Sequence, residues 1–177
     1  MLLGLVRPTE GHIQILGKDL DSRNRLNILS ETGSLIESPA YYGHLSGKEN
    51  LQIVCTLKNV PEKEIQRVLH VVRMEGQQNK KVSQYSLGMK QKLGLAQAIM
   101  EGQDILILDE PFNALDYKTY EDVRTIIRML KAEGKTIFLT SHRYKDIEQL
   151  CAQVYSIEDG RLMPITGELA EQYRQAE

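Results

Sequence analysis

Two neighbouring acids, Asp109 and Glu110, directly follow an unbroken apolar run, Ile105–Leu108. Such a run is typical of a strand buried on both faces of a parallel sheet, and Pro111 ends it. The two carboxylates would then lie just past the carboxyl end of the strand, where open α/β sheets bind their ligands. Taken alone, these residues fit an ordinary strand and turn equally well, so their neighbours must decide their chemistry.

A histidine occupies the matching place after a second apolar run. Thr136–Thr140 is predicted to be another buried strand, and Ser141 and His142 follow at its carboxyl end. A lone histidine is usually a surface residue or a structurally satisfied one. Its placement after a strand, like that of the two acids, favours a functional role for His142.

A polar turn and an amphipathic helix precede the acids. The turn begins near Ser83, and four apolar residues then recur on one helix face: Met89, Leu93, Ala96 and Met100. This stripe predicts packing against a core. A plain capped helix, with no further role, is the alternative interpretation of its first turn.

In this order and at this spacing, the three segments resemble the nucleotide-site motifs of ABC-family ATPases. Tyr85–Gln91 is similar to a variant signature motif, Ile105–Pro111 to the Walker B motif with its catalytic glutamate, and Asn113–Asp116 to the D-loop. Leu87 replaces the first glycine of the usual signature pair, and Met89 replaces the usual glutamine. The resemblance implies an α/β, P-loop NTPase fold with a mostly parallel sheet and an inserted helical subdomain.

Glu37 stands where the family carries the glutamine of its Q-loop, which approaches magnesium and the attacking water and senses the transmembrane subunit. Together with Ile36, Pro39 and the spelling of Ser86–Gln91, this substitution resembles the subfamily of bacitracin and lantibiotic export or immunity transporters. The resemblance places Glu37 near the metal. The alternative is a loop acid that only caps the next element.

In the family, two ATPase domains clamp two nucleotides head to tail, so the resemblance implies ATP and Mg²⁺ as cofactors. Asp109 would bind the water shell of Mg²⁺, an ion that keeps its waters and takes few carboxylates. Glu110 would orient or deprotonate the attacking water, and His142 would hold the γ-phosphate. Asp116 would link the two sites across the dimer.

The signature motif would act on a nucleotide held by a second ABC ATPase subunit. Ser86 and the backbone amide of Gly88 lie where a helix begins, and the positive end of that helix can point at the partner's phosphates. Gly88 would also give the turn its backbone freedom. Gln91 closes the motif and is grouped with these two residues as nucleotide-binding in trans.

No Walker A loop, G-x-x-x-x-G-K-S/T, occurs in the 177 residues, although its amides and lysine hold the nucleotide phosphates in the family. Gly43–Glu49 comes nearest, but its glycines are one residue too close, and Glu49 replaces the hydroxyl residue that holds magnesium. Ser46 and Glu49 are better interpreted as a capping box that opens a helix. We therefore expect an N-terminally truncated domain over residues 1–177, whose Asp109 has no nucleotide in cis.

The strand that leads into the Walker A loop is central in the family's sheet. Its loss would leave an unpaired edge and an exposed apolar flank next to Ile105–Leu108. We expect the isolated chain to be marginally stable or to aggregate.

Residues 45–98 are predicted to form the helical subdomain. A capped helix follows Ser46, and a second begins at Pro61 with four apolar residues on one face: Ile65, Val68, Leu69 and Val72. The signature helix completes the set. Upstream, Met1–Val6 is predicted to be the last turns of an apolar helix stopped by Pro8, and His12–Leu16 to be a strand.

Three further elements are expected after the D-loop. A long amphipathic helix through Val123–Leu130 should end near Gly134. Residues 154–164 are predicted to form a hairpin with an Asp-Gly turn. A polar helix over Gly167–Gln175 would end the chain, and neither it nor the hairpin carries predicted chemistry.

Composition and charge narrow the possible partners and location. The net charge is −2, from 22 Lys and Arg against 24 Asp and Glu, so no basic field points to nucleic acid. No run approaches the roughly 18 apolar residues of a membrane span. Cys55 and Cys151 lack C-x-x-C spacing, which indicates reduced thiols. We expect a cytoplasmic protein, peripheral at the inner face of the cell membrane beside a transmembrane permease subunit.

The sequence therefore favours an ATP-binding and ATP-hydrolysing subunit of an ABC transporter that exports a peptide antibiotic, a lantibiotic or a drug. One alternative is a catalytically silent half-subunit that supplies the signature motif in trans to an intact ABC ATPase. A non-transport ABC ATPase, such as a translation-associated one, is another. Proteins of that last kind typically carry two ATPase domains and basic linkers, and neither occurs in these residues.

Overall fold

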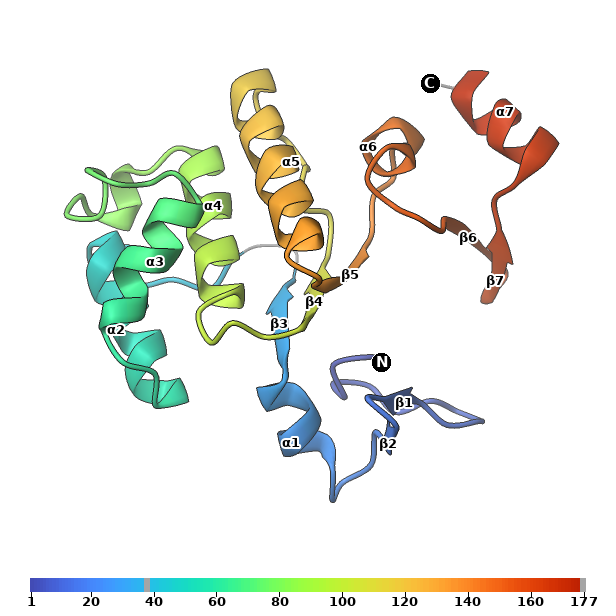
Figure 1. The fold of residues 1–177 in the computed structure, drawn as a ribbon, viewed down its shortest axis with the longest axis horizontal. Coiled ribbons are helices and arrows are strands. Elements are labelled where there is room, and N and C mark those ends of the chain that lie inside the picture. Colours follow the sequence, from blue (N-terminus) through green and yellow to red (C-terminus); the bar gives the residue numbers. More distant parts are fainter. Residues whose placement is uncertain (37–38, 176–177) are drawn as a thin grey trace.

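A parallel sheet lies at the centre of the structure (Figure 1). The computed structural model describes residues 1–36 and 39–175. The sheet has the order β3–β4–β5, with β3 at Thr32–Leu35, β4 at Ile105–Leu108 and β5 at Thr136–Leu139. Both pairings are parallel, and their register places Leu35, Leu108 and Leu139 side by side at the carboxyl ends. The predicted α/β architecture is confirmed.

Strand β4 is the middle strand and pairs on both sides. The prediction of an unpaired edge next to Ile105–Leu108 is therefore wrong. The expected burial holds for one face only, because Leu106 and Leu108 are fully buried whereas Ile105 and Ile107 are half-buried.

Strand β5 is the outer strand, and in the described part of the chain no strand pairs with its far edge. Phe138 on this strand is 47% exposed, and Thr136 is exposed as well. The strand predicted over Thr136–Thr140 is present, but its predicted burial is wrong, because its residues alternate between exposed and half-buried. The open edge of the sheet is here, one strand away from the place expected.

The segment between β3 and β4 is mostly helical. It holds α2 (Gly47–Lys58), α3 (Lys63–Val71), the short 3₁₀ helix η1 (Val82–Gln84) and α4 (Leu87–Ala98). These helices gather on one side of the sheet in Figure 1. The helices predicted after Ser46, after Pro61 and in the signature segment are all present.

The capping box at the start of α2 is confirmed. The Glu49 amide donates to the Ser46 hydroxyl at 3.2 Å, and the Ser46 amide donates to the Glu49 carboxylate at 2.7 Å. Two otherwise orphaned backbone donors are thereby satisfied. Gly43–Glu49 is thus a helix start, not a phosphate-binding loop.

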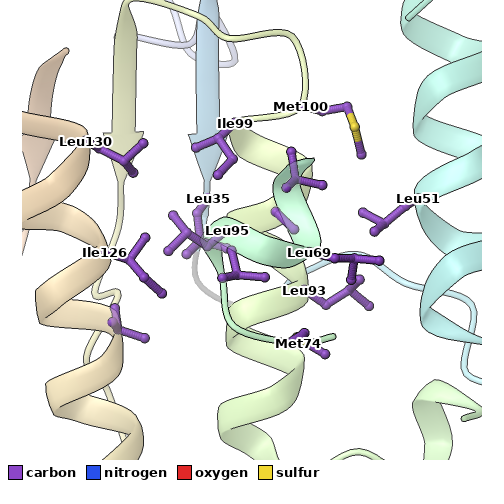
Figure 2. Close-up of a cluster of buried hydrophobic side chains, with 14 of the residues drawn as sticks. Leu35, Leu51, Leu69, Met74, Leu93, Leu95, Ile99, Met100, Ile126 and Leu130 are labelled. Carbon is purple, nitrogen blue, oxygen red and sulfur yellow. The ribbon is translucent and has the colours of Figure 1, made fainter. Parts of the chain in front are cut away.

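Helix α4 lies at the centre of the apolar core. Figure 2 shows Leu93 and Leu95 of α4 between Leu51 of α2 and Ile126 of the following helix. All four side chains are at most 1% exposed. The cluster runs without a break from the helical segment to the sheet. Buried contacts therefore lie on nearly all sides of α4, and not only along the predicted apolar stripe.

Helix α5 (Tyr117–Ala132) connects β4 to β5 and packs beside α4 (Figure 1). Asp116 caps its first turn. Its end falls at Glu133, followed by Gly134 with φ +87°, a left-handed conformation that glycine adopts without strain. The predicted long helix and its glycine stop are confirmed. A short helix after β5, α6 (Tyr144–Glu148), was not predicted.

The C-terminal part contains the predicted hairpin and helix. Strands β6 (Tyr155–Glu158) and β7 (Arg161–Pro164) pair antiparallel across Asp159 and Gly160, whose φ angles are +47° and +77°. Because both turn residues have a positive φ, the turn is of the primed type, whose backbone twist matches the twist of the two strands. Helix α7 (Gly167–Gln175) follows. A groove of about 900 Å³ separates β5 from β6, and Phe138 and Tyr155 are among its lining residues.

The N-terminal part departs from the prediction. Met1–Val6 forms turns and bends with Gly4 at φ +64°, and the predicted apolar helix is wrong. So short a piece cannot sustain a helix unless packing or a cap supports it. The predicted strand over His12–Leu16 shrinks to β1 (Gln14–Ile15), which pairs with β2 (Lys18–Asp19). Helix α1 (Arg25–Ser30) then leads into β3.

None of the helices in residues 1–36 and 39–175 has both the length and the apolar character of a membrane-crossing helix. Both cysteines are free. Burial raises the pKa of the Cys55 and Cys151 thiols, which favours the unreactive protonated form.

Candidate functional site

The ends of the three parallel strands bring the predicted acids together with residues of β5. The Asp109 amide donates to the Leu35 carbonyl at 2.8 Å, and the Thr140 amide donates to the Leu108 carbonyl at 3.0 Å. These bonds continue the ladder one residue beyond the strands. Asp109 and Thr140 therefore stand next to each other at the carboxyl edge of the sheet.

Thr140 joins the two acids. Its hydroxyl donates to the Asp109 carboxylate at 2.5 Å and accepts the Glu110 amide at 3.0 Å. Sequence reasoning missed this role, because Thr140 was counted as a strand residue. The available signal was a hydroxyl at the first position after a strand that neighbours the two acids.

Glu110 and His142 form the exposed part of this site. His142 Nδ1 lies 3.0 Å from a carboxylate oxygen of Glu110, and the side chains are 63% and 28% exposed. Glu110 has φ +47°, a left-handed conformation that non-glycine residues rarely adopt. Such strain persists where the surroundings fix it and is common at active sites. The structure thus places the predicted Asp109, Glu110 and His142 in one contiguous cluster.

The signature segment forms a separate feature at the start of α4. Ser86 caps the helix, and its hydroxyl accepts the Met89 amide at 3.3 Å. Leu87, the next residue, is 51% exposed. The amides of Leu87 and Gly88 have no partner within the helix, as at every helix start. They form the kind of positive helix end that binds anions.

Gly88 is needed for space and not for backbone freedom. It lies inside α4 and does not have a positive φ. A Cβ at this position would meet Thr119 of α5, with Cγ2 at 2.5 Å and Oγ1 at 2.7 Å. Gly88 was predicted to serve backbone freedom, and this prediction is corrected. The close approach of the starts of α4 and α5 requires a residue without a side chain at this position.

Gln91 does not lie on the surface. It is 5% exposed, and its side-chain amide donates to the Pro111 carbonyl at 3.2 Å. In this chain the side chain points into the packing between α4 and the loop, and not toward the surface. The predicted nucleotide-binding role of Gln91 stays a prediction, and in this chain the residue connects α4 to the loop after the two acids.

Asp116 caps α5 with both carboxylate oxygens. One accepts the Thr119 amide at 3.0 Å and the other the Thr119 hydroxyl at 2.7 Å. The hydrogen bond from the Thr119 hydroxyl has the larger effect and that from the Thr119 amide the next largest, and both lower the pKa of the Asp116 carboxyl below its ordinary value. Because Thr119 also touches Gly88, the starts of α4 and α5 form one connected surface.

The oxygen donors at the strand ends suit Mg²⁺. Asp109 supplies a carboxylate beside the hydroxyl of Thr140, and this ion needs only one or two protein carboxylates because it keeps several waters. In residues 1–36 and 39–175, no three His, Cys, Asp or Glu side chains gather as a metal cage. Glu37, the other predicted metal residue, lies outside the described residues. No Walker A loop occurs within the 177 residues.

Comparisons of sequence identify the relatives of the chain. The family model described as ABC transporter matches residues 1–113. The bacitracin transport ATP-binding protein BcrA of Bacillus licheniformis is 41% identical over 165 residues, which cover 92% of this chain and 54% of the relative. The lantibiotic transport ATP-binding protein SrtF of Streptococcus pyogenes is 37% identical over 163 residues, covering 92% and 69%. The chain spans about half the length of the bacitracin transport relatives that it matches.

Solved structures agree with these matches. An ATP-binding subunit of an ABC transporter superposes with a TM-score of 0.80 at 27% identity, over 99% of this chain and 74% of that chain. A dimeric ATP-binding cassette bound to ADP and Pi superposes with a TM-score of 0.78, over 93% and 78%. Its identity is 23%, so that likeness shows the fold alone. By sequence and by fold, the chain belongs to the ABC transporter family, among relatives of ATP-binding subunits of bacitracin and lantibiotic transport.

Proposed function

We propose that the chain is an ATP-binding subunit of a transporter that exports a peptide antibiotic, and that it supplies its signature turn to a nucleotide held by a second ABC ATPase subunit. The observation that carries this proposal is the start of α4. Ser86 caps the helix while the amides of Leu87 and Gly88 stay unpaired within it, beside an exposed Leu87. This turn needs no Walker A loop in its own chain.

The neighbouring start of α5 supports the same surface. Asp116 and Thr119 fix the first turn of α5 against Gly88, and Tyr117 is 81% exposed beside them. A partly apolar surface with a positive helix end suits contact with a subunit that presents a triphosphate. In this proposal Asp116 also couples the two nucleotide sites of the dimer.

The test is the ATP turnover of an intact ABC ATP-binding subunit from the same cell, measured with and without this chain. We expect the purified chain alone to hydrolyse no ATP and to raise the partner's turnover severalfold. Ser86→Arg would place a bulky side chain on the turn and remove the increase. Leu57→Arg, on an exposed face of α2, serves as the matched control and should leave the increase unchanged. Failure of the chain to affect any such partner would contradict the proposal.

A second candidate is hydrolysis by this chain itself, and the cluster at the strand ends favours it. Asp109 and Thr140 would hold Mg²⁺, Glu110 would take the proton of the attacking water, and His142 would face the γ-phosphate. All four residues are already linked by hydrogen bonds of 2.5 to 3.0 Å. Such groups stabilise phosphoryl transfer only around a correctly held triphosphate. No Walker A loop lies within the 177 residues, so a test of this candidate supplies one.

The two candidates give different results in one assay. The chain is fused after the Walker A strand and loop of SrtF, and ATP turnover is measured for the fusion and for its Glu110→Gln variant. Turnover that disappears in the variant would support hydrolysis by Glu110. Absence of turnover in a folded fusion that binds ATP would leave only the role in trans.

The exported compound and the remaining partners belong to the same proposal. The names of the relatives refer to bacitracin and lantibiotic transport, so we propose a peptide antibiotic as the cargo and a transmembrane permease subunit as a further partner. Residues 45–98 would be the helical subdomain of a partial ABC ATPase domain over residues 1–177, placed at the inner face of the membrane. Glu37 and this subdomain would contact the permease.

The cargo is tested by deletion of the gene, which should raise the sensitivity of the cell to bacitracin or to a lantibiotic. Unchanged sensitivity to both classes of antibiotic would contradict the proposed cargo.

A further inference from the structure

Glu110 lies in a loop that is fixed from three sides. Its amide donates to the Thr140 hydroxyl of the neighbouring strand end at 3.0 Å. Its carbonyl accepts the Asn113 amide at 3.1 Å, which closes the loop on itself. The third contact comes from α4, where the Gln91 side chain donates to the carbonyl of Pro111 at 3.2 Å.

The bond between Gln91 and Pro111 is shielded from water. Gln91 is 5% exposed, and Pro111 is buried. In the described part of the chain, no other hydrogen bond joins α4 to residues 109–115. A buried carbonyl that loses its donor is left unsatisfied, which is more unfavourable than the loss of an exposed bond. Phe112 of the loop also packs in the apolar cluster that contains α4, but the hydrogen-bonded connection of the loop to α4 depends on this one side chain.

The position of Pro111 makes this bond act on Glu110. Proline fixes its own φ, so holding its carbonyl leaves little freedom in the backbone that follows Glu110. Glu110 itself has φ +47°, which a non-glycine residue keeps only under external constraint. Release of Pro111 would let Glu110 relax to an ordinary conformation and move its carboxylate away from His142.

The other end of the connection is the signature turn. Gln91 follows Gly88 by three residues and so lies on the same side of α4, one turn further along. On this side α4 meets α5 and its preceding loop three times: Gly88 against Thr119, Gln91 on Pro111 and Lys92 on Asp122. A displacement of the signature turn along or around the helix axis must therefore change the Gln91 bond.

We propose that Gln91 is a positioning residue that couples the signature turn of α4 to the carboxylate of Glu110 through the Pro111 carbonyl. The proposal rests on the proposed function for the roles of the two ends, but the coupling is a property of the chain alone. It gives the chain a route by which contact of Ser86 and Gly88 with a partner's nucleotide alters the acid of its own strand-end site.

The test uses the complete chain without nucleotide. The first readout is the ring resonance of His142, assigned among the four histidines with His142→Gln, because the imidazole contacts the Glu110 carboxylate. The second is hydrogen exchange of the Glu110 and Asn113 amides. Gln91→Met keeps the length of the side chain but removes the donor. We expect His142 to shift toward its position in Glu110→Gln, and exchange at the two amides to rise on the order of tenfold.

Gln97→Met is the matched control. Gln97 lies on the same helix and donates to the Ala40 carbonyl at 3.3 Å, away from the Glu110 loop. It should leave both readouts as in the wild type. If Gln91→Met does not fold, Gln91→Asn provides a shorter side chain that keeps the amide but cannot reach Pro111 without a shift.

Two results would overturn the proposal. One is a folded Gln91 variant in which His142 and the two amides behave as in the wild type. The other is a uniform rise in exchange across α4 and α5 with no selective change near Glu110, which would show a purely structural role. Because neither readout needs ATP or a partner, this test can fail while the proposed function stands, and the reverse is also possible.

Discussion

The two nucleotide-related regions differ in how they are supported. The signature turn begins a helix that is buried on nearly all sides and that touches α5 through Gly88 and Lys92. The strand-end cluster is well connected within itself, but it rests on β5, whose outer edge has no strand beside it in the described residues. The signature turn is thus the firmly packed region, while the region that resembles an active centre borders the open side of the sheet.

The largest expected effect distinguishes the packed side of the sheet from the open one. Leu106→Ala removes a fully buried side chain from β4 and should lower the free energy of unfolding by about 2–5 kcal/mol. Phe138→Ala removes a larger side chain that is 47% exposed on β5, and should cost less than about 1 kcal/mol. Urea unfolding at equilibrium measures both. Equal losses would mean that the outer edge of β5 is covered in solution, which would remove the contrast.

The contact between Gly88 and Thr119 tests the packing of the signature turn. Gly88→Ala should destabilise the fold by about 1–3 kcal/mol, because the added methyl group meets Thr119 and the helices cannot separate freely. Thr119→Ala removes the two nearest atoms and should recover part of this loss in the double variant. A double-mutant cycle in urea gives the coupling, which we expect to exceed about 1 kcal/mol. Additive losses would show that the two helix starts are not in contact.

Asp122 tests the ionic link between α4 and α5. Its carboxylate contacts Lys92 at 2.5 Å and Arg73 at 3.0 Å. Burial acts to raise the pKa of Asp122, but the hydrogen bonds and charges of Lys92 and Arg73 outweigh it and lower the pKa overall. A lowered folded-state pKa means stabilisation that is present above about pH 4 and lost as the pH falls through the folded-state value.

Asp122→Asn should therefore cost about 1.5 kcal/mol at pH 7, with a difference from the wild type that narrows below about pH 4. Urea unfolding at a series of pH values measures it. A difference that stays constant from pH 7 to pH 3 would show that the charge of Asp122 contributes nothing. Asp104→Asn, a mostly exposed partner of Lys135, is the control and should have little effect.

The smallest expected effect concerns the segment that most nearly resembles a phosphate-binding loop. Ser46→Ala removes the cap of α2 and should cost about 1 kcal/mol in thermal or urea unfolding. Addition of ATP should not change this loss, since the hydroxyl serves the helix. Protection of the wild type by ATP that disappears in Ser46→Ala would mean that Gly43–Glu49 binds phosphate, and would add a nucleotide site to the helical side.

Local signals in the sequence predicted much of this arrangement. The run Ile105–Leu108 with its following acids, and the capping box of Ser46, each depend on residues close in the chain. The unbroken apolar run predicts β4 although its hydrogen bonds reach the distant strands β3 and β5, whereas the cap is predictable because its hydrogen bonds are local. The hairpin turn at Gly160 and the helix stop at Gly134 follow for the same reason.

What the sequence could not show depends on distant neighbours. The exposure of Phe138 follows from which strands flank β5, and the burial of Gln91 follows from elements on every side of α4. Gly88 was expected to serve the backbone, yet the atom that requires it belongs to Thr119, on another helix. Thr140 lies at the end of an apolar run, so its local sequence context did not reveal its role. The register of β4 and β5 places its hydroxyl between the two acids.

The central claim is that the signature turn of this chain completes a nucleotide site on another subunit. The most direct measurement is sedimentation of the chain mixed with an intact ABC ATP-binding subunit of its own cell, in which the Walker B glutamate is replaced by glutamine so that ATP is retained. We predict a one-to-one complex that forms with ATP, not with ADP, and that Ser86→Arg abolishes. A complex that forms equally without nucleotide, or that survives Ser86→Arg, would contradict the claim.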